Sequence, residues 1–206
     1  MTEAALLANG IAEMGLAVSE YAQQQLLQYL ALLQKWNKVY NLTAVRQPQD
    51  MVTLHLLDSL SVLPYVGHQN LLDVGSGAGL PGIVMAICKP ELAVTTIDTV
   101  QKKAIFMRQV KGELGLDNLT VVHARVENYQ PPAPFAQIIS RAFSDIALFT
   151  QLTQHLIARN GQWLAMKGLV PTQEFVGLTL QPNQIIPLQV AGLNAERHLI
   201  VMHHDH

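Results

Sequence analysis

The sequence predicts an α/β fold in which a mostly parallel sheet is covered by helices on both faces. From Asn70 onward, short apolar runs alternate with segments of helical length. That alternation is typical of β-α-β units, whose parallel strands are buried on both faces. Before about residue 65 the apolar residues recur with helical spacing only. We therefore expect one domain, 1–206, with an N-terminal helical extension over 1–65 and a Rossmann-like core over 70–206.

The extension is expected to contain two helices. Ser19 can cap the first, in which apolar residues recur three and four positions apart, at Leu26, Leu27, Leu30, Leu33 and Trp36. An apolar stripe of this kind usually packs into a core. The second helix is expected over 49–63, because Pro48 precedes it and Pro64 ends it.

The core is expected to contain seven strands. Five apolar runs predict parallel strands, over 71–74, 93–97, 119–122, 137–140 and 163–166. Helices are expected between and after them, over 81–88, 100–114, 145–158 and 172–180. Two further apolar stretches, 184–191 and 197–203, are joined by Gly192, Leu193 and Asn194 and predict a terminal hairpin with an antiparallel C-terminal strand.

Composition excludes several classes of protein. Half of the residues are hydrophobic and 14% are charged, which favours a folded core over a disordered chain. The apolar runs are shorter than the roughly 20 residues of a membrane-spanning helix, and the N-terminus has no signal-peptide pattern. We therefore expect no membrane contact and a cytoplasmic location. A monomer is also expected, although the sequence does not fix the oligomeric state. Cys88 lies in an apolar run and is expected to be a packed thiol. No metal site is expected, and the last residues, His203, His204, Asp205 and His206, are expected to form a frayed tail.

The net charge of -2 does not by itself favour a nucleic-acid partner. The distribution of charge is more informative than the sum. Lys35, Lys38 and Arg46 lie in a stretch without acidic residues. A second stretch is rich in basic residues, which outnumber Glu113 and Asp117 there, namely Lys102, Lys103, Arg108, Lys111 and Arg125. Both stretches are explained equally well by solvated helix faces, so charge alone leaves the partner open.

The strongest local signal is a strand that runs into a glycine-rich turn and then a helix, LLDVGSGAGLPG over 71–82. Glycines let the backbone approach a ligand closely, and a helix N-terminus offers unpaired N–H groups. A dinucleotide site would show G-x-G-x-x-G. Here the position three after Gly77 is Leu80, and the third glycine stands at Gly79 instead. The spacing therefore disfavours a nicotinamide cofactor.

Two carboxylates flank this turn. Asp73 is expected to attract the amino group of a methionine moiety. Asp98 ends the second strand, nineteen residues after Gly79, where a carboxylate can accept hydrogen bonds from both ribose hydroxyls. A purely structural alternative for Asp98 is the N-cap of the following helix. The joint pattern, together with the antiparallel last strand, favours S-adenosylmethionine as the cofactor and, by analogy of fold, a class I methyltransferase.

Further motifs lie outside the glycine turn. They are Lys35-Trp36-Asn37 with Asn41-Leu42-Thr43, His55-Leu56-Leu57-Asp58-Ser59, Leu80-Pro81-Gly82, Arg125-Val126-Glu127, Ser140-Arg141-Ala142, Lys167-Gly168 and Arg197-His198-Leu199. In this set the chain resembles the bacterial 16S rRNA guanine-N7 methyltransferases of the RsmG or GidB family, and the likeness covers nearly all of its length. Thr99 and Ala124 depart from the usual family residues, but both are small and concern details of the cofactor pocket.

The resemblance implies a guanine in the 530 loop of the small-subunit RNA as the substrate. It also implies cofactor contacts from Gly75, Leu80, Val126, Glu127 and Arg141, which join Asp73, Gly77 and Asp98 as expected cofactor residues. Basic residues near strand ends can hold phosphate or guanine O6. The expected substrate residues are Lys167, Arg197, Arg125 and Lys35, for which salt bridges to Asp or Glu are the structural alternative.

The expected chemistry requires no general base. Guanine N7 attacks with an in-plane lone pair and loses no proton, so positioning should dominate the rate. We therefore assign no catalytic residue. His55 is expected to be a buried histidine and Asp58 to pair with a neighbour. A small-molecule methyltransferase and a catalytically silent cofactor-binding module remain as alternatives, because either could carry the same glycine turn.

Overall fold

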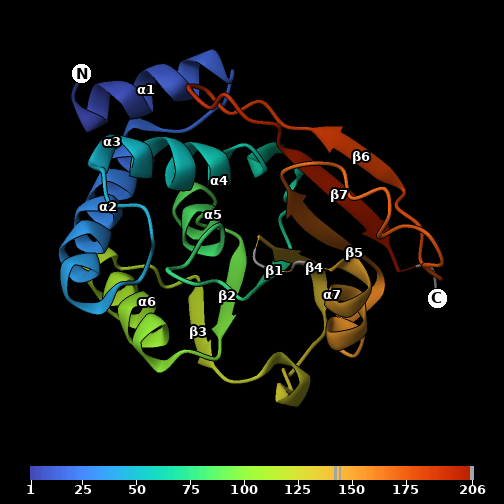
Figure 1. Cartoon of the computed structure of the whole chain (residues 1–206). Coiled ribbons are helices and arrows are strands. Elements are labelled where there is room, and N and C mark those ends of the chain that lie inside the picture. Colours follow the sequence, from blue (N-terminus) through green and yellow to red (C-terminus); the bar gives the residue numbers. More distant parts are fainter. Residues whose placement is uncertain (142, 144, 205–206) are drawn as a thin grey trace.

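The computed structural model describes residues 1–141, 143 and 145–204, and within them seven strands form one sheet (Figure 1). The strand order is β3-β2-β1-β4-β5-β7-β6. The strands are β1 Asn70–Val74, β2 Ala93–Asp98, β3 Leu119–His123, β4 Phe135–Ser140, β5 Ile157–Lys167, β6 Gln184–Pro187 and β7 His198–His203. β1 to β5 are parallel, and β7 is antiparallel to both β5 and β6. The predicted fold class is therefore confirmed.

The strand order reverses beside β1. The chain builds β2 and β3 on one side of β1 and then places β4 on the other side. In open α/β sheets such a reversal leaves a crevice at the carboxyl ends of the two central strands, where ligands bind. The expected cofactor turn follows β1 and the expected Arg141 follows β4, so the topology brings both to this crevice.

Successive strand residues face two separate apolar layers. In β1, Leu71 packs into one layer and Leu72 into the other, and in β4 the same holds for Ile139 and Ile138. The first layer is covered by α5 Gly82–Cys88, α6 Gln101–Leu114 and the N-terminal helices, and the second by α7 Ile146–Thr153 (Figure 1). Burial on both faces explains why the strands are continuous apolar runs rather than alternating ones.

The N-terminal extension supports the glycine turn. It begins with α1 Glu3–Glu13, a helix beyond the two that the sequence predicts. The next helix, α2 Glu20–Tyr40, is capped by the Ser19 hydroxyl, which accepts a hydrogen bond from the Ala22 N–H at 3.1 Å. The buried Tyr29 of α2 donates its hydroxyl to the Ala78 carbonyl in the turn, at 2.8 Å. The extension is therefore packed against the core beside the expected site.

The helix expected over 49–63 forms with an altered middle. It starts as α3 Pro48–Met51, widens into the π-helical turn η1 Val52–Leu57, resumes as α4 Asp58–Leu60 and is followed by the 3-10 turn η2 Leu63–Tyr65. Single π-helical turns inside α-helices frequently mark functional sites. This turn carries His55 and is followed directly by Asp58.

Three expectations are wrong in detail. No helix forms over 172–180. Gly177 there adopts a positive φ of 81°, which a right-handed helix does not accommodate, and the apolar side chains pack onto the second layer from turns instead. The helix expected over 145–158 ends at Thr153, because β5 already starts at Ile157. The prediction of a frayed tail is wrong for His203 and His204. His203 is the last residue of β7, and the ring of His204 lies edge-on to Trp163. Asp205 and His206 lie outside the described residues.

The packing of Cys88 agrees with the sequence. Cys88 is half-buried, and burial raises the pKa of its thiol to about 12, as expected for a packed cysteine. Among the described helices, none has the length and hydropathy to cross a membrane. The described residues also contain no cluster of three or more His, Cys, Asp or Glu side chains that could hold a metal ion.

Candidate functional site

The glycine turn after β1 has backbone angles that explain its glycines. Gly75, Gly77 and Gly79 have φ values of 68°, 61° and 98°, a region in which other residues are strained. A Cβ on Gly79 would come within 2.2 Å of the Ile83 side chain, whereas a Cβ on Gly77 would meet no described atom within 4 Å. Gly79 therefore serves the packing of α5, and Gly77 faces open space.

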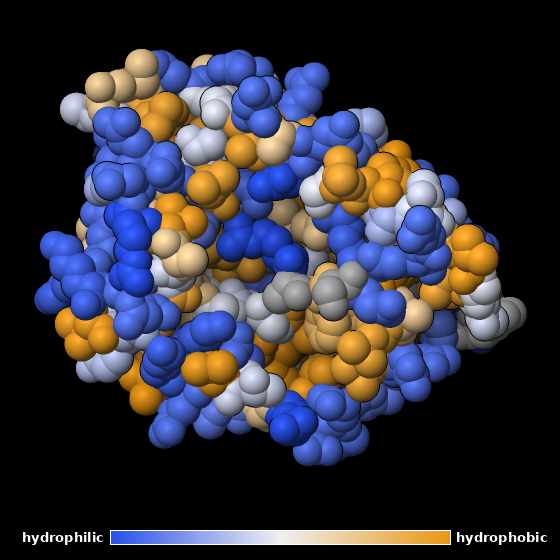
Figure 2. All heavy atoms as spheres, viewed as in Figure 1, coloured by the Kyte–Doolittle hydropathy of each residue, from blue (hydrophilic) through white to orange (hydrophobic). Residues whose placement is uncertain are grey.

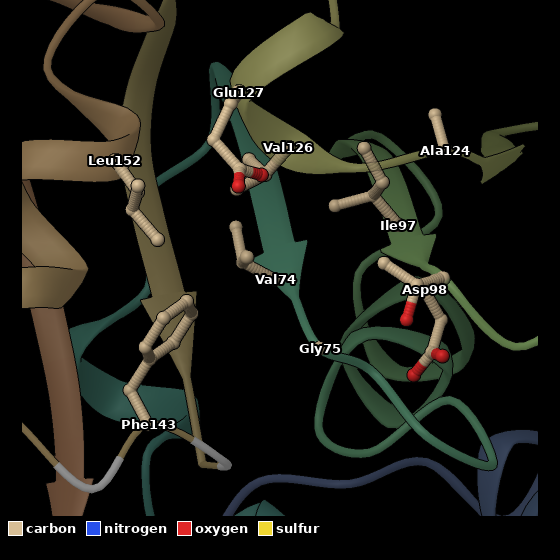
Figure 3. Close-up of a pocket in the computed structure, with 10 residues that line it drawn as sticks. Val74, Gly75, Ile97, Asp98, Ala124, Val126, Glu127, Phe143 and Leu152 are labelled. Atoms are coloured by element: carbon tan, nitrogen blue, oxygen red, sulfur yellow. The ribbon is translucent and has the colours of Figure 1, made fainter.

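Two cavities adjoin this turn, and Gly75 lines both. The first has a volume of about 230 Å³ and a largely apolar wall; its lining is Val74, Gly75, Ile97, Asp98, Thr99, Ala124, Val126, Glu127, Phe143 and Leu152 (Figure 3). The second has about 270 Å³ and is more polar; its lining is Leu42, Thr43, His55, Gly75, Ser76, Gly77, Ala78, Leu80, Lys103 and Arg141. An apolar compartment beside a polar one suits an adenosine joined to an amino acid.

Asp98 holds local backbone, although Val100 and not Asp98 is the N-cap of α6, and its ribose role stays a prediction. Its carboxylate accepts hydrogen bonds from the backbone N–H groups of Gly77 and Val100, both at 2.8 Å, so it fixes the glycine turn and the start of α6. The same side chain lines the apolar cavity, across from Phe143 and Leu152 (Figure 3). A carboxylate accepts up to about four hydrogen bonds, so two bonds to the backbone leave capacity for ribose hydroxyls.

Asp73 lies behind the turn. Its side chain is fully buried, its Oδ2 accepts a hydrogen bond from the Gly82 N–H at 2.8 Å, and its Oδ1 has no partner among the described residues. Burial raises the pKa of this carboxyl to about 7. It is not part of the described lining of either cavity. The geometry therefore supports a role in holding the start of α5, and direct attraction of a cofactor amino group stays a prediction.

His55 is a site residue that the sequence reasoning set aside. It is buried as expected, but it also lines the polar cavity. Its Nε2 lies 2.9 Å from the Thr43 hydroxyl, and its Nδ1 has no hydrogen-bond partner in the described chain. Burial, with the nearby Arg141 charge, lowers its pKa to about 4, so the imidazole is neutral near pH 7. Periodicity did not reveal this position, because the π-helical turn that carries it leaves no signature in the sequence.

Three of the expected basic residues lie in ion pairs beside the cavities. Asp58 binds both Arg141, at 3.1 Å, and Arg197, at 2.8 Å. Lys167 lies 3.3 Å from Glu174 and donates to the Phe143 carbonyl at 3.2 Å. The salt bridges that the sequence offered as an alternative for Lys167 and Arg197 therefore exist. They hold the two side chains near the crevice and do not exclude a role with substrate.

The remaining expected residues are spread around the crevice. Val126 and Glu127 line the apolar cavity from the 3-10 turn η3 Val126–Asn128, and Arg125 is exposed directly before that turn. Lys35 is exposed on α2 and is absent from the described cavity linings. Figure 2 shows hydrophilic residues near the centre of this face, with apolar residues around them. The structure thus brings most of the expected cofactor residues together, and Lys35 stays a peripheral prediction.

Solved structures share this architecture. An O-methyltransferase from Bacillus cereus, solved in complex with SAH, aligns with a TM-score of 0.59 and 14% identity, covering 85% of this chain and 90% of its own. A SAM-dependent methyltransferase from Aquifex aeolicus aligns with a TM-score of 0.55 and 18% identity, covering 73% and 92%. These similarities concern the fold, which is that of S-adenosylmethionine-dependent methyltransferases.

Sequence comparisons give the family. A family model described as GidB, rRNA small subunit methyltransferase G, matches residues 22–200. The protein named ribosomal RNA small subunit methyltransferase G from Methylobacillus flagellatus is 63% identical over 196 residues, covering 95% of this chain and 96% of the relative. The protein of the same name from Nitrosospira multiformis is 49% identical over 211 residues, covering 98% of each. Together with the fold, these matches identify S-adenosylmethionine as the cofactor. The chain belongs to the rRNA small subunit methyltransferase G family.

Proposed function

We propose that this enzyme methylates N7 of a guanine in the 530 loop of 16S rRNA within the small ribosomal subunit. The observation that carries the proposal is the pair of cavities that both include Gly75 in their lining, with the basic side chains of Arg141, Lys167 and Arg197 held in ion pairs nearby. Family membership supports RNA of the small subunit as the substrate. The resemblance in the motifs around Asn41, Arg141 and Arg197 supports the choice of nucleotide.

The residues present fit S-adenosylmethionine. The apolar cavity would hold the adenine against Val126, with the Asp98 carboxylate at the ribose hydroxyls. The polar cavity would hold the methionine part beside Gly77 and Arg141. The open space in front of Gly77, which a Cβ would enter without meeting any described atom, is the space a ligand needs to approach the backbone.

Positioning is the contribution that the chain makes to the chemistry. When bound, S-adenosylmethionine supplies a methyl group on a positively charged sulfur, and an aromatic nitrogen with an in-plane lone pair can accept it without losing a proton. The chain therefore needs to orient two reactants and exclude water. The lowered pKa of His55 makes its neutral imidazole a weak proton acceptor, which agrees with chemistry that needs no general base.

The basic residues supply the substrate side. Lys167 is the last residue of β5, and Arg197 directly precedes β7, whose first residue, His198, pairs with Lys167. Guanidinium and ammonium groups at this edge can bind phosphate and hydrogen-bond to guanine O6. Arg125 and Lys35 would add attraction for phosphates farther from the reacting base. We also propose that the enzyme acts as a monomer in the cytoplasm and without a metal ion, since its ribosomal substrate is there and the chemistry requires none.

A labelling experiment tests this function. Small subunits from a strain lacking the enzyme are incubated with S-adenosylmethionine labelled in its methyl group, in parallel with a metabolite extract. We expect label in 16S rRNA, at one guanine that then becomes sensitive to strand cleavage specific for N7-methylguanosine. Label in the metabolite extract alone would favour a small-molecule methyltransferase. No transfer despite cofactor binding would indicate a silent binding module.

A further inference from the structure

Asp58 joins two arginines that belong to different parts of the site. Its Oδ2 accepts from Arg141 Nη1 at 3.1 Å and its Oδ1 from Arg197 Nε at 2.8 Å. Arg141 lines the polar cavity, whereas Arg197 precedes β7 on the substrate side. We propose that Asp58 is a positioning residue that aims both arginines and thereby connects cofactor binding with methyl transfer. For the Arg197 half, this inference rests on the proposed function.

The hydrogen bonds determine which donors remain for ligands. Arg141 uses Nη1 for both Asp58 and the Leu54 carbonyl, the latter at 3.0 Å. A guanidinium has five N–H donors, so within the described contacts the Nη2 and Nε donors of Arg141 are left for a ligand. Arg197 uses Nε for Asp58 and Nη1 for the Glu196 carbonyl. Its Nη2 donors are left in the same way. Each arginine is therefore held by some of its N–H donors, and its other N–H donors are available for a ligand.

The electrostatics favour an orienting role. Asp58 is 3% exposed, while the side chains of Arg141 and Arg197 are 28% and 25% exposed. The negative charge is thus enclosed, and the two positive charges still reach solvent. One carboxylate between two guanidinium groups leaves a net charge of +1, so the group can still attract phosphate or a carboxylate. Removing one partner from a buried ion pair is costly, because the other charge is left without compensation.

The local backbone explains why Asp58 can reach both arginines. Leu54 lies in the π-helical turn η1 and Asp58 follows it directly, so the carbonyl and the carboxylate that bind Arg141 come from adjacent turns of one helical segment. Arg141 and Arg197 are 83 and 139 residues away from Asp58 in the sequence. The group thus joins the N-terminal extension, the end of β4 and the start of β7.

The first test is Asp58→Asn, which preserves size and removes the charge. The amide keeps one acceptor oxygen and turns a donor toward the other arginine. We expect the Kd for S-adenosylhomocysteine, measured by calorimetry, to rise about tenfold and kcat on small subunits to fall about tenfold. Asp50→Asn is the matched control, because Asp50 is exposed in the same helical segment; it should leave both values unchanged. Unchanged values in Asp58→Asn would overturn the proposal.

Double variants distinguish positioning from a general effect on folding. In an Arg141→Gln background, Asp58→Asn should cause little further loss of S-adenosylhomocysteine affinity. In an Arg197→Gln background, it should cause little further loss of kcat at saturating cofactor and RNA. Independent effects that multiply in both backgrounds would show that Asp58 acts only through stability, and the proposal would be wrong.

Two measures keep the test decisive. If Asp58→Asn alone does not fold, the double variant Asp58→Asn, Arg197→Gln preserves the net charge of the group; it should fold and still bind S-adenosylhomocysteine weakly, and native affinity would contradict the proposal. The calorimetry needs no RNA. If the native enzyme transferred no methyl group to RNA, the proposed function would fail, whereas the Asp58–Arg141 half would still be judged by the affinity for S-adenosylhomocysteine.

Discussion

At the scale of single residues, substitution of Gly77 should affect both ligand binding and backbone strain, and a control glycine separates the two effects. Gly77→Val should abolish S-adenosylhomocysteine binding, because the side chain would fill the open space in front of the turn. It should also lower the melting temperature, since a β-branched residue is strained at a φ of 61°. Gly15→Val is the matched control: Gly15 has a φ of 63° and equally open surroundings in the described structure. It should lower the melting temperature and leave affinity, measured by calorimetry, unchanged. Native affinity in Gly77→Val would remove this residue from the site.

Asp98 should influence both affinity and stability. Asp98→Ala removes the expected bonds to the ribose and two bonds to backbone N–H groups. We expect cofactor binding to weaken by about 1–3 kcal/mol and the melting temperature to fall as well. Calorimetry and thermal unfolding of one preparation measure both. A lower melting temperature with native affinity would leave Asp98 with only the structural role.

His55 predicts a pH dependence of stability. Its pKa is lowered from 6.5 to about 4 in the folded protein. Between these values the unfolded chain binds a proton that the folded protein does not, so this group reduces stability as the pH falls from about 6.5 to about 4. Asp73 has the opposite effect over all of this range, since its pKa is raised from 3.8 to about 7. The free energy of unfolding of the native protein relative to His55→Gln, from denaturant titrations, should decrease over this interval. A constant difference would contradict the lowered pKa.

At the scale of elements, the N-terminal extension should matter for the cofactor through Tyr29. Tyr29→Phe removes the hydrogen bond to the Ala78 carbonyl in the glycine turn. The expected cost is about 0.5–1.5 kcal/mol of stability, with weaker S-adenosylhomocysteine binding because the turn loses a support. Tyr21→Phe, on the same helix but 68% exposed, is the control and should change neither. Equal calorimetric affinity in the two variants would show that the turn holds its shape without α2.

The elements also show what the sequence could and could not predict. The strands and the glycine turn followed from local apolar runs and from glycine spacing, both of which are properties of neighbouring residues. The prediction of a helix over 172–180 was wrong. Its apolar residues pack onto the second layer of the core, which consists of residues distant in the sequence. The sequence predicted that Asp58 pairs with a neighbour, but it did not predict the two partners. Arg141 and Arg197 are far away from Asp58 in the sequence. The π-helical turn was also not predicted.

At the scale of the whole molecule, low overall charge predicts recognition of a shaped surface. With a net charge of -2, non-specific affinity for RNA should be low. Small subunits should therefore be methylated much better than the isolated 530-loop hairpin. Lys35→Ala should weaken binding modestly and reduce the log–log salt slope by about one unit, whereas Arg197→Ala should mainly lower transfer at saturating RNA. Filter binding and initial rates over a salt series measure these effects. Equal turnover on hairpin and particle would instead identify a short local sequence as the recognised element.

The position of β7 has a consequence for how this protein matures. Among the described strands it is synthesised last, yet it lies inside the sheet, and β6 is held to the sheet through it. Arg197 stands immediately before it. Chains fold from the N-terminus during translation, so the extension and the glycine turn can form while the sheet is still open at β5. The residues that line the two cavities are thus synthesised before β7. The complete substrate side forms only after the ribosome has synthesised β7.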